Sequence, residues 1–116
     1  MRKPAVFHPL ARKAIRDFSV GARKELGEAI GKLQLGETLG MPLSRPMPSV
    51  ASGVSELRIK DEAGEWRVFY VVNTEEAVYL FHAFAKKTQK TSDRDIKLGQ
   101  RRLKEWEVYR AQTKEK

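Results

Sequence analysis

The chain has 116 residues, and 23 lysines and arginines against 15 aspartates and glutamates give it a formal net charge of +8. This length indicates one domain, and the basic excess favours a polyanionic partner, either nucleic acid or an acidic protein. The absence of cysteine excludes disulfides and thiolate metal sites. No apolar run reaches the roughly 20 residues that span a bilayer, so we expect no membrane partner. The lack of cysteine is compatible with a reducing cytosol, and we expect a cytoplasmic location.

The N-terminal half of the chain has the pattern of a short strand followed by two helices. Ala5–Phe7 is apolar and predicts an edge strand, and Pro9 then suits the start of a helix. Apolar residues at helical spacing predict a first helix over 10–18 and a second helix that Ser19 caps. The proline- and serine-rich segment from Gly40 to Gly53 predicts a long loop.

Three strands joined by short turns follow this loop. Val54–Lys60 alternates apolar and charged residues, as expected of a half-buried strand. Asp61–Gly64 has the composition of a hairpin turn with glycine at positive φ. Two strands that are apolar on both sides come next, Trp66–Val72 and Ala77–Phe84. The turn Asn73–Glu76 separates them. The pattern predicts an antiparallel meander whose last two strands are covered on both faces.

The last third of the chain begins with a basic segment and continues as a helix. Lys86–Ser92 contains three lysines, and Ser92 with Asp95 three residues later is typical of a helix N-terminus. We expect a basic helix from about Asp93 to Tyr109. The domain is therefore predicted to span residues 1–110, and residues 111–116 to form a polar tail.

The candidate chemistry lies in basic side chains that neighbouring strands bring together. Arg58 and Arg67 are charges within apolar strands, and the predicted hairpin allows both to face the same side of the sheet. Lys86 and Lys87 follow the adjacent strand. Four cations on one face require an anion, and a phosphodiester suits the arginine fork. The alternative for either arginine is a solvated position on the sheet surface.

Other residue types give weaker indications of function. His82 lies in a strand, where a hydrogen-bonded packing role is the common alternative to a functional one. With two histidines and no cysteine, the pattern of a zinc site or a Ser-His-Asp triad is missing from the sequence. Strand aromatics such as Phe84 are core residues by default, although one or two of them could stack on a base.

Three sequence segments together resemble a known family. They are Gly-Val-Ser-Glu-Leu-Arg at 53–58, Trp-Arg-Val-Phe-Tyr at 66–70 and Phe-His-Ala-Phe-Ala-Lys-Lys-Thr-Gln-Lys-Thr at 81–91. With the two helices before them and the basic helix after them, they resemble the phage-derived, HigB-like toxins of the RelE/ParE superfamily. The resemblance runs from about Val6 to Trp106. It implies an α+β, RelE-like fold, with two N-terminal helices packed on a curved antiparallel sheet of three to four strands and a basic C-terminal helix.

The resemblance also implies an activity, namely that of the toxin of a type II toxin–antitoxin pair. Similar toxins cleave messenger RNA, usually on the ribosome, by attack of a 2′-hydroxyl on the adjacent phosphate without a metal or other cofactor. Arg67, Arg58, Lys86 and Lys87 match the catalytic positions, and either lysine would act as the base if its pKa were depressed. The tyrosine or histidine that often completes such sites has no clear equivalent.

Further basic residues would extend the contact with RNA beyond the catalytic positions. The residues that we expect to bind RNA are Lys60, Lys90, Arg94 and His82. Two other functions remain open at this point. One is a ParE-like toxin that inhibits DNA gyrase by protein binding, although the cationic cluster favours the ribonuclease. The other is an RNA-binding module without catalysis.

The resemblance implies partners as well. They are a cognate helix-turn-helix antitoxin, messenger RNA and the ribosome, with operator DNA contacted only through the antitoxin complex. An acidic or hydrophobic antitoxin segment would either cover the cationic face or dock on the N-terminal helices.

Overall fold

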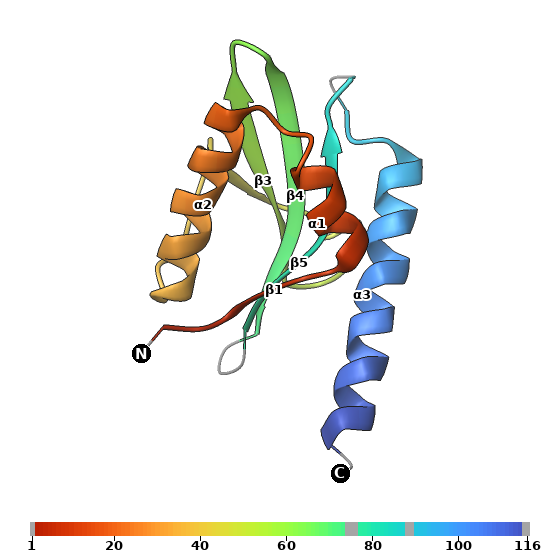
Figure 1. The fold of residues 1–116 in the computed structure, drawn as a ribbon. Coiled ribbons are helices and arrows are strands. Elements are labelled where there is room, and N and C mark those ends of the chain that lie inside the picture. The colour runs from red at the N-terminus through yellow and green to blue at the C-terminus, as the bar shows by residue number, and fades with distance from the viewer. Residues whose placement is uncertain (1, 74–76, 88–89, 115–116) are drawn as a thin grey trace.

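The computed structural model describes residues 2–73, 77–87 and 90–114. In this part of the chain, a five-stranded sheet with the order β1-β5-β4-β3-β2 lies between helices on both faces (Figure 1). The elements are β1 (Ala5–Phe7), α1 (Pro9–Ile15), α2 (Val20–Gln34), β2 (Ser44–Pro46), β3 (Val54–Asp61), β4 (Gly64–Asn73), β5 (Ala77–Ala85) and α3 (Asp93–Lys114). The expected α+β fold is confirmed.

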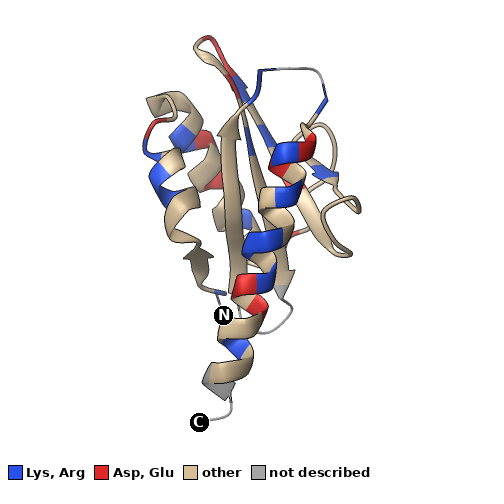
Figure 2. Ribbon diagram, turned by 90° about the vertical axis from the view of Figure 1, so that its right-hand side faces the viewer, with Lys and Arg blue, Asp and Glu red and all other residues tan. Residues whose placement is uncertain are grey.

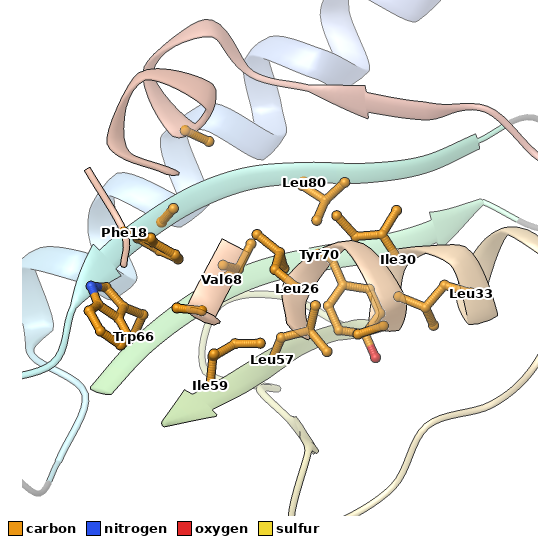
Figure 3. Packing of buried hydrophobic residues seen from close by; sticks show 14 of the residues in the cluster. Phe18, Leu26, Ile30, Leu33, Leu57, Ile59, Trp66, Val68, Tyr70 and Leu80 are labelled. Carbon is orange, nitrogen blue, oxygen red and sulfur yellow. The ribbon is translucent and has the colours of Figure 1, made fainter. Parts of the chain in front are cut away.

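One hydrophobic core lies between the sheet and the two N-terminal helices. Leu26, Ile30 and Leu33 recur at helical spacing along α2 and pack with Leu57 and Ile59 of β3 (Figure 3). The alternation of β3 directs these two side chains to this face and Glu56, Arg58 and Lys60 to the other. The sequence pattern of Val54–Lys60 therefore determines which face of β3 carries charge.

A second core lies on the opposite face, under α3. Phe69 and Phe81 are fully buried there and join a cluster with Leu103 of α3. Tyr79 stacks on Trp106 of α3 with ring centroids 4.2 Å apart. Because β4 and β5 supply apolar side chains to both cores, the prediction that these strands are covered on both faces is confirmed.

The sheet differs from the prediction in two ways, although Ala5–Phe7 forms the edge strand that was predicted. The sheet is mixed, because β1 pairs with β5 in parallel, and it contains five strands rather than three or four. Within the predicted loop 40–53, Ser44–Pro46 forms β2 and pairs with Ser55–Leu57. Proline is tolerated there because an edge strand has one side free of ladder hydrogen bonds. The predicted turn residues Thr74–Glu76 lie outside the described part of the chain.

The helix termini follow capping rules. Ser19 accepts a hydrogen bond from Ala22 N at the start of α2, and Ser92 accepts one from Asp95 N at the start of α3, as predicted. His8, for which no such role was predicted, caps α1 by accepting from Leu10 N. At its other end α3 continues to Lys114, beyond the expected end and into the predicted tail.

A side-chain hydrogen bond joins the β3–β4 hairpin to the start of α2. Ser19 Oγ donates to Asp61 Oδ2 at 2.5 Å, and this hydrogen bond lowers the pKa of Asp61. Gly64 has φ 153°, in the region that favours glycine, as the sequence predicted for the turn. The hairpin therefore has a defined position relative to α2.

Gly99 allows α3 to approach the sheet closely. A Cβ at Gly99 would lie 2.7 and 2.9 Å from two ring carbons of Phe69, which is fully buried. We expect Gly99→Ala to lower the free energy of unfolding by about 1–3 kcal/mol, because the ring must shift in a packed core. Chemical denaturation measures this change.

Gly27→Ala is the matched control. Gly27 is exposed on α2, and no atom of the surrounding structure lies within 4 Å of the position that an added methyl group would take. The substitution should therefore stabilise the protein by up to about 1 kcal/mol through helix propensity. Equal stability of the Gly99→Ala variant and the unchanged protein would contradict the close approach of α3.

Candidate functional site

The β3–β4 hairpin and the end of β5 form the main candidate site, a pocket of about 550 Å³ that we call the hairpin pocket. Strands β3 and β4 and the first residue after β5 supply its cations. The residues that line it are Glu25, Pro42, Leu43, Arg58, Ile59, Lys60, Glu65, Arg67 and Lys86. The pocket therefore combines four cations, two carboxylates and a small apolar wall.

The register of the hairpin places the two arginines together. Asp61 pairs with Gly64 across a two-residue turn, which makes Arg58 the direct cross-strand partner of Arg67. Direct partners lie on one face of a sheet, so the prediction that both arginines face the same side is confirmed. Like charges in these positions repel, and this repulsion calls for nearby anions.

Arg67 is buried between two carboxylates. It is 4% exposed, its Nη1 lies 3.5 Å from Glu56 Oε1, and its Nη2 lies 3.6 Å from Glu65 Oε2. Its Nε and Nη1 atoms are buried and make no hydrogen bond. Burial lowers the pKa of Arg67 and the adjacent Arg58 lowers it further, while Glu56 opposes both effects. Arginine nevertheless stays charged at neutral pH.

Glu56 is the buried counterion of this arginine. It is 1% exposed, and besides its ion pair with Arg67 it accepts a 2.9 Å hydrogen bond from Thr91 Oγ1 at Oε2. Thr91 belongs to the segment between β5 and α3. Glu56 therefore holds the guanidinium in place and also attaches the lysine-rich segment to the sheet.

Glu65 is the second carboxylate, and it contacts three cations. Its carboxylate oxygens lie 3.6 Å from Lys60 Nζ, 3.6 Å from Arg67 Nη2 and 3.5 Å from Lys86 Nζ. Burial alone would raise the pKa of Glu65, but Lys86, Lys60 and Arg67 together lower it. Glu65 is consequently ionised at neutral pH and carries a single negative charge at the centre of the cations.

The remaining predicted residues line a neighbouring depression, which we call the β5–α3 groove. Lys86 borders both the hairpin pocket and this groove, whereas Lys87 borders only the groove. The residues of the groove are His82, Phe84, Ala85, Lys86, Lys87, Lys90, Ser92, Arg94, Asp95 and Leu98. Basic residues recur along α3 beyond it (Figure 2). The predicted cations thus occupy two adjoining depressions rather than one cluster.

His82 has a packing environment rather than an open one. Its side chain is 5% exposed and lies between two groups of α3: Asp95 Oδ1 is 2.8 Å from Nε2, and Arg102 Nη1 is 2.9 Å from Nδ1. Arginine only donates, so Nδ1 accepts and the proton lies on Nε2, facing Asp95. Burial lowers the pKa of His82 and Arg102 adds to this effect, while the hydrogen bond to Asp95 opposes it without reversing it. His82 borders the β5–α3 groove but exposes little of its side chain there, so its contact with RNA stays a prediction.

Comparison with known proteins places this chain in a family. Residues 13–104 match the family described as "Phage derived protein Gp49-like (DUF891)". The chain belongs to the phage-derived Gp49-like family. A solved structure of an arginine-to-alanine double mutant of the E. coli toxin RelE in the free state is similar to this Gp49-like protein, with 19% identity and a TM-score of 0.44 over 72% of this chain and 82% of that one. No curated protein sequence matches it.

Sequence reasoning missed the acidic residues of the Gp49-like site. Glu56 alternates with Arg58 on one side of β3, and Glu65 lies two residues before Arg67 on β4. The two-residue turn makes Glu65 the partner of Lys60. This alternation was visible in the sequence. The burial of Glu56, however, depends on where α3 and Thr91 lie, and no local sequence pattern predicts their positions.

The described part of the chain offers neither a metal site nor a membrane-spanning helix. No group of three or more histidine, cysteine, aspartate or glutamate residues within it is placed to hold a metal ion. No described helix is long and apolar enough to cross a membrane.

The environment of His82 predicts how stability depends on pH. Because the pKa of His82 is lower in the folded chain than its ordinary value of 6.5, the unfolded chain binds this proton more readily. The contribution of neutral His82 to the free energy of unfolding is therefore fully present at pH values well above 6.5. It is lost as the pH falls through 6.5 towards the pKa of His82 in the folded chain. We expect the midpoint of thermal unfolding to fall between pH 7.5 and about 5.5, above the range in which carboxylates titrate.

Variants at the two histidines assign this effect. His82→Gln should flatten the pH profile even if its absolute stability is lower, whereas His8→Gln should retain the decline. An unchanged slope in the His82→Gln variant would show that another group is responsible.

The buried pair of Glu56 and Arg67 predicts a non-additive effect on stability. Glu56→Ala should lower the free energy of unfolding by about 3 kcal/mol or more, because it leaves Arg67 buried without its counterion. Adding Arg67→Met should cost less than the sum of the two single changes. Chemical denaturation of the three variants measures the coupling, with Glu62→Ala on the exposed turn as the control. Additive costs would contradict an ion pair between the two side chains.

Proposed function

We propose that this Gp49-like protein is the toxin of a type II toxin–antitoxin pair, of the HigB-like kind, and that it cleaves messenger RNA. The observation that carries the proposal is that Arg58, Arg67, Lys60 and Lys86 line a single pocket. Cations gathered in this way suit a phosphodiester, which has two anionic oxygens for a guanidinium fork. Membership of the phage-derived family and the resemblance of its sequence segments to HigB-like toxins support the same function.

The proposed chemistry is transfer within the RNA backbone. The 2′-oxygen forms a bond to the adjacent phosphorus, the bond from phosphorus to the 5′-oxygen breaks, and the products are a cyclic phosphate and a 5′-hydroxyl. The 2′-hydroxyl loses a proton and the leaving 5′-oxygen gains one. Arg67 and Arg58 would stabilise the additional negative charge of the phosphorane, and removing one such donor typically costs about 100-fold or more in rate.

The β5–α3 groove would hold the neighbouring nucleotides. Lys87, Lys90 and Arg94 border it, and Lys86 joins it to the hairpin pocket. An RNA strand bound along both depressions would place successive phosphates against cations, and its affinity would fall steeply with salt. Partly buried Phe84 also borders the groove and is the aromatic side chain best placed to contact a base.

The proposed setting is the cytoplasm, with the ribosome supplying the messenger RNA. The proposed partner is a helix-turn-helix antitoxin, through which the complex would reach operator DNA. The chemistry needs no cofactor, because the cations that stabilise the phosphorane belong to the chain itself.

Variants of the hairpin pocket test the proposal. Arg58→Ala and Lys86→Ala should each reduce cleavage of a translated message by about 100-fold, measured by primer extension. Arg67→Ala would also leave Glu56 buried without a partner, so Arg67→Lys is the better variant because it keeps the charge and removes only the fork.

Lys32→Ala is the control, since it removes one positive charge from an exposed position in the last turn of α2. Cleavage by this variant should match that of the unchanged protein. Undiminished cleavage by folded Arg58→Ala and Lys86→Ala variants would remove the hairpin pocket from the activity.

A further inference from the structure

One carboxylate occupies the centre of the cations that we assign to phosphate binding. Glu65 lies between 3.5 and 3.6 Å from Lys60, Arg67 and Lys86, which come from three different parts of the sheet. A phosphodiester has the same single negative charge and also presents two oxygens. The protein's own side chain therefore already fills the position where an anion is best stabilised.

The two carboxylates near Arg67 differ in how firmly the surrounding structure holds their side chains. Glu56 has a side chain that is 2% exposed and is held by Thr91, so it remains in place when a ligand binds. The side chain of Glu65 is 35% exposed and lies at the rim of the pocket beside Lys60, whose own side chain is 78% exposed. Glu65 can therefore turn outward with Lys60 and release Arg67 and Lys86.

We propose that Glu65 is a specificity-determining residue that occupies the phosphate position of the hairpin pocket, and that a phosphodiester binds by taking its place. This inference rests on the proposed function for the identity of the ligand. Arg67 supplies a geometric reason, because Glu65 Oε2 lies 3.6 Å from its Nη2, which is longer than a good charge-assisted hydrogen bond. A phosphate oxygen that takes the place of Glu65 Oε2 can accept a shorter hydrogen bond from Nη2.

Displacement of Glu65 makes the pocket selective for a chain of phosphates. When a single free phosphate binds, one anion replaces another in the pocket, so the favourable binding free energy is small. Binding of an RNA strand also breaks the ion pairs of Glu65, but the strand adds contacts with Lys87 and Arg94 in the adjoining groove. The pocket should consequently bind oligonucleotides well and small phosphates poorly, and this preference should depend on Glu65.

Calorimetric titration of three purified proteins tests the inference, with inorganic pyrophosphate and a 2′-O-methyl RNA oligonucleotide as probes that cannot be cleaved by 2′-hydroxyl attack. Glu65→Gln should bind pyrophosphate about tenfold more tightly than the unchanged protein, the factor expected when a few surface-strength ion pairs no longer compete. Glu62→Gln makes the same change of net charge on the exposed turn of the same hairpin, and its affinity should change by less than about twofold.

Two further variants keep the test decisive. Lys86→Ala added to Glu65→Gln should abolish the gain, because it removes one of the released cations. Glu65→Asp keeps the charge on a shorter side chain and should show a smaller gain, which tests the position even if the glutamine variant folds poorly. Equal gains in the Glu62 and Glu65 variants, or weaker binding by Glu65→Gln, would overturn the inference.

The outcome is separable from that of the proposed function. Tighter binding by Glu65→Gln without RNA cleavage by the unchanged protein would support the anion position and contradict the nuclease. RNA cleavage by the unchanged protein, with no increase in the affinity of the Glu65 variants for pyrophosphate, would support the nuclease and contradict the anion position.

Discussion

The two-residue turn of the β3–β4 hairpin is the constraint on which the site depends. It fixes the register that places Arg58 opposite Arg67 and Lys60 opposite Glu65. A shift of one residue would move every one of these side chains to the other face of the sheet. The apolar residues of the same strands enforce the same register, because slippage would bring charge into the core under α2. Packing on one face of the sheet thus positions the charges on the other.

The close placement of two arginines is possible because the chain supplies two carboxylates beside one of them, Arg67. Glu56 is a permanent counterion with its position set by Thr91, and Glu65 is an exchangeable one at the surface. The net charge of the pocket is therefore moderate before a ligand binds. Fold stability and ligand binding depend on the same ion pairs, so changes to Arg67 affect both.

The sequence allowed much of the fold to be predicted, because local patterns carry it. Periodicity identified the helices and the meander, and the capping roles of Ser19 and Ser92 follow from short-range hydrogen bonds. Strand β2 was missed, and the parallel pairing of the predicted edge strand β1 was not foreseen, since three-residue edge strands have little periodicity and form through pairing with distant segments. The burial of His82 also depends on α3, because Arg102 reaches it from a later part of the chain.

The cations of the candidate site were predicted more fully than its anions. Basic residues in apolar strands are conspicuous, and the hairpin explains how they meet. The balancing role of Glu56 arises only when α3 closes one side of the sheet, and the triple contact of Glu65 needs the end of β5 beside the hairpin. Long-range packing, rather than composition, decides which charges are neutralised within the chain.

In the proposed reaction, the hairpin pocket holds an RNA phosphate while the neighbouring 2′-oxygen attacks it. Analysis of the RNA ends that form when a translated message is incubated with ribosomes and this protein tests that reaction most directly. We expect a 2′,3′-cyclic phosphate on the upstream fragment and a 5′-hydroxyl on the downstream fragment. Intact messages, or fragments with 5′-phosphate ends, would contradict it.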